Sequence, residues 1–278
     1  MAGQENLTEP FEIIVVDNGS RIPPSEVCAA FGAKLLIQPV PGPGPARNMG
    51  AAASTGGILA FIDADCVADP RWLAEICGYF RDNPDAEIIG GDVRVGCKEP
   101  GRPTWLEAYE SVFAYRMKEY IARQGFTGTG NLAMRRTTFD AVGPFGGIEI
   151  AEDRDWGQRA LAMGRITRYC ASMIVFHPAR ENFSEIARKW QRHIAHDLEA
   201  MRAKPAWRVR WLARAMAVAA SPAYEIIRIS LSDRISGPRA RLLAFAGVVM
   251  IRFYRAAVMC NAAFSGDAPS MAQRWNRA

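Results

Sequence analysis

The sequence predicts an α/β fold with a mostly parallel sheet flanked by helices, followed by a basic helical region at the C-terminus. Two short apolar runs, FEIIVV at residues 11–16 and ILAFI at residues 58–62, have the composition of strands buried on both faces of a sheet. Strand and helix patterns alternate between and after these runs, as in α/β proteins. The chain is also globular in composition, since 49% of its 278 residues are hydrophobic and 23% are charged.

The first elements of this pattern are separated by short connections. Asn18-Gly19 is a turn signal that ends the first strand, and Gly56-Gly57 ends a small-residue helix just before the second apolar run. The predicted elements are, in order, a strand at 11–16, a helix at 25–31, a strand at 34–38, a helix at 46–54 and a strand at 58–62.

Later elements follow from helical and extended periodicity. A helix at 70–80 is expected because Trp72, Leu73, Ile76 and Phe80 form one apolar stripe. The remaining predictions are a strand at 87–95, one continuous helix at 105–121, a helix at 152–163, two short strands at 166–169 and 173–176, and an amphipathic helix at 183–201. We therefore expect a sheet domain over residues 1–182 and a helical region over residues 183–278.

Charge and cysteine content limit the classes of partner and the compartment. A net charge of +5 and a pI near 9.0 suit an anionic partner such as a nucleotide, a nucleic acid or an acidic lipid. The six cysteines are scattered without C-x-x-C spacing, which is typical of reduced thiols in a cytosolic protein. The N-terminus lacks the pattern of a signal peptide, and because no run of about 18 apolar residues occurs, no membrane-spanning helix is expected.

Two carboxylates, Asp63 and Asp65, follow directly after the strand at 58–62. Open α/β sheets bind ligands at the carboxyl ends of their strands, and residues two apart on an extended strand point the same way. Two carboxylates in one pocket favour a divalent cation, since Mg²⁺ binds one or two carboxylates together with phosphate oxygens. The alternative is a solvated turn, in which aspartate is common.

The C-terminal region is strongly basic. Between residues 202 and 255, eleven Lys and Arg residues accompany only Glu225 and Asp233, and apolar stretches alternate with the bases. Basic amphipathic helices of this kind lie at anionic membrane surfaces. The alternative is a helical cap whose arginines are simply solvated.

Six segments resemble, in composition and order, the family 2 glycosyltransferases with the GT-A fold, a Rossmann-like sheet flanked by helices. They are FEIIVVDNGS, GPGPARNMGAAAS, ILAFIDADC, GTGNLAMRR, AEDRDWGQRAL and VFHP, and they cover roughly residues 11–180. The resemblance implies an inverting transferase that moves a sugar from a nucleotide-diphosphate donor to an acceptor hydroxyl. The acceptor would belong to polysaccharide, glycolipid or lipid-linked oligosaccharide synthesis, on the cytoplasmic face of a membrane, and nucleic acid would not be a partner.

The resemblance also assigns roles to individual residues of this chain. It implies donor binding by Asp17, Arg47, Asn48 and Asp63, a DXD-type Mg²⁺ or Mn²⁺ site at Asp63 and Asp65 with His177 as a further metal contact, and catalysis by Asp153 with Glu152 beside it. An alternative for His177 is a core histidine at the end of a strand. The Gly-rich segment at 127–131 lacks the Lys-Ser/Thr of a P-loop and by itself is a weak phosphate signal. Arg135 and Arg136, which follow it, are expected to be surface charges.

Asp153 suits the part of the general base on physical grounds. A carboxylate in the first turn of a helix should keep a low pKa and stay ionised, ready to accept the proton of the acceptor hydroxyl. The alternative for the Glu152-Asp153 pair is helix capping alone.

The chain departs from the family pattern at its start. Family members have a strand and helix before the segment that matches FEIIVVDNGS, but only ten residues precede Phe11 here. We therefore expect the strands at 11–16 and 58–62 to lack a neighbour, unless an upstream segment or a partner supplies one. A non-catalytic remnant of the same fold and a nucleotidyltransferase are the alternative functions. Because the Gln-x-x-Arg-Trp signature of processive synthases is absent, addition of a single sugar is favoured over polymerisation.

Overall fold

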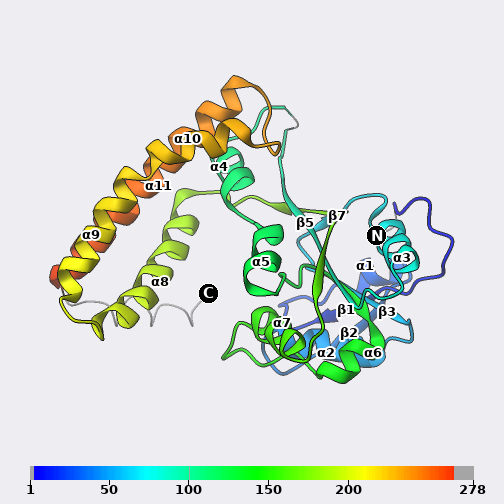
Figure 1. The fold of residues 1–278 in the computed structure, drawn as a ribbon. Coiled ribbons are helices and arrows are strands. Elements are labelled where there is room, and N and C mark those ends of the chain that lie inside the picture. The colour runs from blue at the N-terminus through cyan, green and yellow to red at the C-terminus, as the bar shows by residue number, and fades with distance from the viewer. Residues whose placement is uncertain (1–2, 100, 266–278) are drawn as a thin grey trace. The chain divides into compact units, whose positions relative to one another are not determined.

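The computed structural model describes residues 3–99 and 101–265, and the chain divides into two compact units (Figure 1). The first unit comprises Met1–Arg94 and Tyr115–His177, and the second comprises Val95–Ala114 and Pro178–Ala278. The expected ranges were 1–182 and 183–278, so the helical unit also takes in an excursion from the first half of the chain. The helix in this excursion packs against the long C-terminal helix, which is why it groups with the second unit.

The first unit contains two sheets. The strands β1 (Ile14–Asp17) and β2 (Lys34–Ile37) form a parallel pair in which Ile14 lies opposite Lys34. The second sheet has the order β3-β6-β5-β7-β4. Its strands are β3 (Ile58–Ile62), β4 (Val67–Ala68), β5 (Ile88–Gly96), β6 (Asn131–Arg135) and β7 (Thr167–Pro178).

The α/β class is confirmed, but the strand directions are mixed and not mostly parallel. The pairs β3/β6, β5/β6 and β4/β7 are all antiparallel. The difference arises mainly from β6, because the sequence suggested only a Gly-rich segment followed by surface charges there. In the structure Asn131–Arg135 is a buried strand that lies between β3 and β5.

The strands β1 and β3 each have one edge without a strand partner within the described ranges. Strand β1 pairs with β2 and strand β3 pairs with β6. The lack of a neighbour expected for both strands is therefore observed.

Helices pack against both sheets of the first unit. They are α1 (Ser25–Ala30), α2 (Pro43–Ala53), α3 (Trp72–Asp82), α5 (Met117–Gln124), α6 (Arg136–Val142) and α7 (Glu152–Ala162). The predicted stripe of α3 is buried in one core cluster together with Ile89 and Met173. A second cluster includes Leu59, Met134 and Trp156. Burial of a large apolar side chain stabilises a fold by about 1.5–3 kcal/mol, so these clusters hold the strand ends in place.

Two predicted elements are wrong in their extent. The single helix expected at 105–121 is two helices, α4 (Trp105–Phe113) and α5, separated at Tyr115, whose φ of 49° lies in the left-handed region. The two short strands expected at 166–169 and 173–176 are the single strand β7, because Ala171 and Ser172 stay extended within the sheet. In both cases tertiary packing overrides the local sequence signal.

Arg135 and Arg136 are not simple surface charges. The Arg135 guanidinium donates to the backbone carbonyls of Phe80, Pro84 and Ala86 and lies over the Phe80 ring. Arg136 donates to the carbonyls of Ala51 and Gly56 and to the Ser54 hydroxyl. Each arginine thus donates to carbonyls at or just after the C-terminal end of a helix, which is a favourable place for a cation.

The second unit is helical. Its elements are α4, α8 (Phe183–Arg202), α9 (Trp207–Ala220), α10 (Pro222–Leu231) and α11 (Gly237–Ser265). Helix α11 packs against all four other helices of the unit. One apolar cluster joins α4 to α11 through residues such as Leu106 and Val248, and another joins α8, α9 and α11 around Trp211.

Helix α11 has the length and composition of a membrane span, contrary to the expectation of no such segment. Within Gly237–Phe264, the most apolar window of 18 residues has a mean hydropathy of 1.7, and a third of that window is buried inside the structure. The sequence expectation considered only uninterrupted apolar runs, and it therefore missed a helix in which few charged residues interrupt the apolar window. A core helix passes the same test of length and composition.

Candidate metal and donor site

The turn after β3 carries the two aspartates that the sequence singled out. Strand β3 ends at Ile62, and the backbone N–H of Cys66 donates to the Asp63 carbonyl oxygen at 3.0 Å, which closes a tight turn. The expectation that Asp63 and Asp65 point the same way assumed an extended strand and does not apply to a turn. The two carboxylates instead belong to two separate groups of side chains.

The first group is centred on Arg47 of helix α2. Its Nη2 donates to Oδ1 of Asp63 at 2.8 Å, and its Nη1 donates to Oε1 of Glu152 at 2.6 Å. The side chains of Arg47 and Glu152 are 15% and 17% exposed, whereas that of Asp63 is 41% exposed. Three residues predicted to act at one site therefore meet, although 105 positions separate Arg47 from Glu152.

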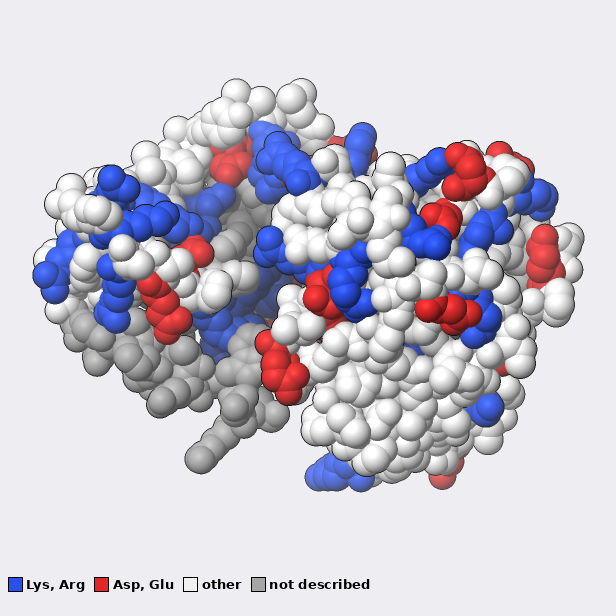
Figure 2. Space-filling view, turned by 60° about the horizontal axis from the view of Figure 1, so that its bottom comes forward, with Lys and Arg blue, Asp and Glu red and all other residues white. Residues whose placement is uncertain are grey.

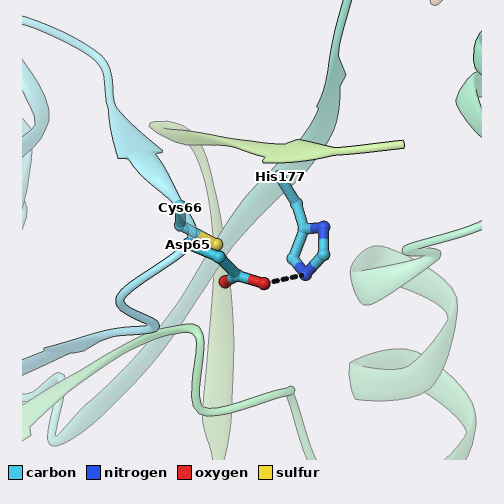
Figure 3. Close-up of side chains that lie close together, drawn as sticks. All are labelled: Asp65, Cys66 and His177. Atoms are coloured by element: carbon cyan, nitrogen blue, oxygen red, sulfur yellow. Dashed lines mark ion pairs between the residues drawn. The ribbon is translucent and has the colours of Figure 1, made fainter. Parts of the chain in front are cut away.

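The second group joins Asp65 to His177 near the end of β7 (Figure 3). Nε2 of His177 lies 3.2 Å from Oδ2 of Asp65, and Nδ1 of His177 lies 2.9 Å from the Tyr115 hydroxyl. The break between α4 and α5 brings Tyr115 to this position. The imidazole is only partly buried and is held from both sides by polar partners, unlike a histidine enclosed in an apolar core.

The donor atoms of the second group fit a divalent cation. One possible ligand atom each from Asp65, Cys66 and His177 lies within 4.8 Å of the others. Burial, followed by the charges of Asp63 and Asp65, raises the pKa of the Cys66 thiol to about 12, so at neutral pH this thiol is protonated and a poor ligand for a hard cation. Asp65 and His177 therefore remain as the candidate protein ligands, and such a site would leave positions for phosphate oxygens.

Asp63 is not part of this metal-type group. Its Oδ1 atom is bound by Arg47, and its Oδ2 atom faces the backbone of Gly130. A Cβ atom placed on Gly130 would lie 2.5 Å from that oxygen, so a larger residue there would displace the Asp63 carboxylate. Asp63 thus belongs with the predicted donor-binding residue Arg47.

The Gly-rich segment before β6 contacts the site residues more closely than its weak sequence signal suggested. Gly130 is packed against Asp63, and a Cβ on Gly128 would lie 3.9 Å from Oδ2 of Asp153. Asn131, fully buried, accepts from the indole of Trp72 and donates to two backbone carbonyls, which anchors the segment in the core. The signal available in the sequence was the run Gly-Thr-Gly-Asn itself.

Asp153 differs from its expectation in one respect. Its pKa is raised, mainly because burial disfavours the charged carboxylate and also because Glu152 is close, although the Arg154 backbone N–H and the Arg47 charge act in the opposite direction. The prediction of a low pKa was therefore wrong, because desolvation outweighs the field of the helix N-terminus. A carboxylate with a raised pKa accepts a proton more readily when it is ionised.

Two predicted donor residues lie outside both groups. Asp17, at the end of β1, is buried and accepts from the Ser20 backbone N–H at 3.3 Å. The Asn48 amide donates to the carbonyl oxygen of Phe145 at 2.9 Å and accepts from its N–H at 2.8 Å. Asn48 thus ties α2 to the segment before α7. A hollow beside Asn48 is lined by β2 and α2 and does not reach the aspartates after β3.

Comparison with known proteins supports the family resemblance seen in the sequence. The family model for Glycosyl transferase family 2 matches residues 3–143. Glycosyltransferase AglE of Haloferax volcanii is 33% identical over 186 residues, which are 64% of this chain and 60% of that protein. The glucosyl-dolichyl phosphate glucuronosyltransferase of the same organism is 32% identical over 107 residues, which are 30% of this chain and 34% of that protein. The chain thus covers less than two thirds of the length of these relatives.

Among solved structures, the mannosyltransferase PcManGT from Pyrobaculum calidifontis, in complex with GDP-Man and Mn²⁺, is similar to this chain with a TM-score of 0.54. The alignment covers 100% of this chain and 81% of that chain at 17% identity, so it shows a shared fold. The matched family region spans just over half of the chain and includes Asp17, Arg47, Asp63 and Asp65. This chain belongs to glycosyl transferase family 2.

Proposed function

We propose that the chain transfers a sugar from a nucleotide-diphosphate donor to an acceptor hydroxyl with inversion at the anomeric carbon. The observation that carries this proposal is that Arg47 forms ion pairs with both Asp63 and Glu152. Asp65, two residues after Asp63, contacts His177. This arrangement supplies a basic side chain and cation ligands, which a departing diphosphate requires.

A divalent cation, Mg²⁺ or Mn²⁺, would be held by Asp65 and His177. When bound, it supplies positive charge to the oxygens of the leaving diphosphate. The structurally similar mannosyltransferase was solved with Mn²⁺ and a nucleotide sugar, which supports this assignment. Arg47 is held in place by its two carboxylates and adds a fixed cationic side chain on the donor side.

Asp153 is the better general base of the two acidic residues that open α7. Oε1 of Glu152 is engaged by Arg47, whereas Asp153 faces the Gly-rich segment and has a raised pKa. Asp153 would accept the proton of the acceptor hydroxyl while the hydroxyl oxygen attacks the anomeric carbon. The diphosphate would leave from the opposite face of the sugar ring, so a single displacement inverts the configuration.

The second unit would hold the protein against an anionic membrane surface on the cytoplasmic side. Lys and Arg outnumber Asp and Glu on the face of the helical unit seen at the left of Figure 2. Helix α10 also exposes Tyr224, Ile227 and Leu231, spaced three and four residues apart and thus on one face. This apolar face would insert into the membrane interface while the Lys and Arg side chains contact the lipid headgroups, so the unit would lie on the surface without spanning the bilayer. A position at the membrane surface suits a glycolipid or lipid-linked acceptor. One relative is named for a dolichyl phosphate substrate.

The transferase proposal is tested by screening nucleotide sugars with the full chain and Mn²⁺, with thermal stabilisation and release of nucleoside diphosphate as readouts. We expect one donor to stabilise the protein and to be slowly hydrolysed only when metal is present. If no nucleotide sugar binds in the presence of Mg²⁺ or Mn²⁺, the chain is a non-catalytic relative.

The membrane proposal has a separate test, sedimentation with vesicles of phosphatidylcholine with or without phosphatidylserine. We expect binding only to the anionic vesicles, and weaker binding as the salt concentration rises. Tyr224→Ser and Leu231→Ser should weaken it further. Resistance to extraction by both high salt and alkali would instead indicate that α11 spans the bilayer.

A further inference from the structure

The helical unit contains a group of cations around the indole of Trp190, which we call the Trp190 cluster. It consists of Lys189 and Trp190 of α8 and Arg255 of α11. The guanidinium carbon of Arg255 lies 3.6 Å from the centre of the Trp190 ring, and Nζ of Lys189 lies 5.8 Å from it. An arginine stacked on an indole is fixed in position, because the ring attracts the cation and restricts its rotamers.

The carboxylates near this cluster are already engaged by other arginines. Glu110 accepts from the backbone N–H and the guanidinium of Arg180. Asp197 forms an ion pair with Arg214 at 2.6 Å, and Glu225 forms one with Arg252 at 2.7 Å. Within residues 3–99 and 101–265, neither Lys189 nor Arg255 forms an ion pair. The Trp190 cluster therefore carries two cations without a matching anion.

Burial is the main cause of the lowered pKa values in this part of the unit, and neighbouring cations act in the same direction, whereas Glu110 acts in the opposite direction on Lys189 and Asp197 on Arg255. Burial, followed by the charge of Arg180, lowers the pKa of Lys189. Burial and the charge of Arg252 lower the pKa of Arg255 to about 10. The pKa of His193, one turn further along α8, is also lowered by burial and by Lys189.

Arg255 also has an unsatisfied donor. Its Nε atom is buried and has no hydrogen-bond partner among the described residues. A buried donor without an acceptor is costly, and two partly buried cations without an anion add a smaller cost. A single anionic ligand that accepts hydrogen bonds would remove both costs.

We propose that the Trp190 cluster is a phosphate-binding site in which Lys189 and Arg255 hold the anionic oxygens of a phosphate or diphosphate group. A guanidinium and an ammonium are the side chains that bind phosphate through charged hydrogen bonds, and a phosphate dianion matches the two cations in charge. The site is distinct from the donor site, because it lies in the other unit of the chain and uses cations directly without a metal. The phosphate belongs either to the headgroup of a lipid-linked molecule or to a soluble phosphate ester.

The test is a calorimetric titration of the full chain with inorganic pyrophosphate in the presence of EDTA, so that no metal supports binding at the donor site. We expect Lys189→Gln and Arg255→Gln each to weaken binding by roughly tenfold or more, since a charged hydrogen bond is lost. Arg239→Gln is the matched control, because Arg239 is exposed on the same helix as Arg255. It should bind as tightly as the unchanged chain, and so should Asp65→Ala.

Lys189→Arg, which keeps the charge, should retain most of the affinity and guards against a loss of folding in the glutamine variants. Equal affinity in the unchanged chain, Lys189→Gln and Arg255→Gln would overturn the proposal. An equal loss in Arg239→Gln would also overturn it, because binding would then depend only on total charge.

The source of the phosphate is decided with phosphatidylcholine vesicles that contain or lack a polyprenyl phosphate. Vesicle binding that needs the polyprenyl phosphate and is lost in both glutamine variants assigns the site to a lipid headgroup. If the two variants bind these vesicles like the unchanged chain but lose pyrophosphate, the ligand is a soluble phosphate ester. Neither result depends on sugar transfer, so a failure here is separable from a failure of the proposed transferase activity.

Discussion

The two units of this protein differ in how their cationic side chains are paired with carboxylates. In the first unit Arg47 is bound by two carboxylates at 2.6 and 2.8 Å, and Asp65 with His177 forms a cluster suited to a cation. In the second unit the carboxylates around Trp190 are occupied by other arginines, and Lys189 and Arg255 remain without an ion pair among the described residues.

This difference indicates two ways to attract a phosphate group. An acidic site binds phosphate through a metal, and its affinity depends on the carboxylate that holds the cation. A basic site binds phosphate directly, and its empty form is destabilised by its own repulsion. A balanced arginine such as Arg47 should therefore stabilise the folded chain, whereas an unbalanced cation such as Lys189 should stabilise it only when a ligand is bound.

The largest effect is expected for Asp65→Ala. Removal of this carboxylate leaves His177 as the remaining ligand and should abolish metal-dependent binding of a nucleoside diphosphate, measured by calorimetry with Mn²⁺. Asp82→Ala, an exposed change at the end of α3, should bind normally. Undiminished binding in Asp65→Ala would remove Asp65 from the metal site.

A smaller but still large effect is expected for Asp153→Asn. Turnover should fall by about 10²–10⁴-fold, the contribution of a general base, while donor affinity stays nearly unchanged. Asp155→Asn on the same helix breaks a pair with Arg159 and should have little effect on turnover. Loss of donor affinity in Asp153→Asn would instead make Glu152 the better candidate for the base.

The pH profile offers a second measure of Asp153. A base must be ionised to act, and burial raises the pKa of this carboxyl. The rate should therefore fall on the acid side at a higher pH than an ordinary aspartate would cause. An acid limb at or below the ordinary aspartate range would show that another group limits the reaction.

The variant Arg47→Gln tests whether the ion pairs of Arg47 stabilise the folded chain. The change leaves the charges of Glu152 and Asp63 without their partner, so the free energy of unfolding in urea should fall by about 1.5–3 kcal/mol. Adding Glu152→Gln should restore part of this loss. Arg255→Gln is the contrasting variant and should leave stability unchanged or higher, since it removes an unbalanced cation. Equal destabilisation by both arginine changes would contradict the comparison between the two units.

The smallest effect concerns the pH dependence of stability at Lys189. Because the pKa of this lysine is lowered in the folded chain, the unfolded chain binds more protons between that pKa and the ordinary value of 10.5. The free energy of unfolding should thus rise with pH in this window, by a small amount because water screens a partly exposed group. Lys189→Gln should flatten the rise, and Lys118→Gln, at an exposed position, should not.

Much of the local structure follows from the sequence. The strand at Ile58–Ile62, the apolar stripe of α3 and the helix that begins at Glu152 were all predicted from composition and periodicity. These signals are reliable because burial of one helix face or one strand is encoded by neighbouring residues. The clustering of Arg47 with Asp63 was expected from the family resemblance, not from the spacing.

Other features arise only from tertiary contacts. Arg135 and Arg136 look like surface charges in the sequence, but they bind the helix-end carbonyls of Phe80 and Ala51, which lie far away along the chain. Tyr115 lies within a helical pattern, yet it breaks the helix and reaches His177. Asp153 has a helix-terminal position that favours a low pKa, yet burial raises it.

The sequence by itself thus determined the elements and the residue types available for chemistry, because backbone preference and hydrophobic periodicity are local. Only the tertiary structure decided which charges are paired. Arg47 meets Glu152 across 105 positions, while Lys189 and Arg255 come from two different helices and meet at one indole ring. The physical reason is that ion pairing and desolvation depend on distances that packing alone sets.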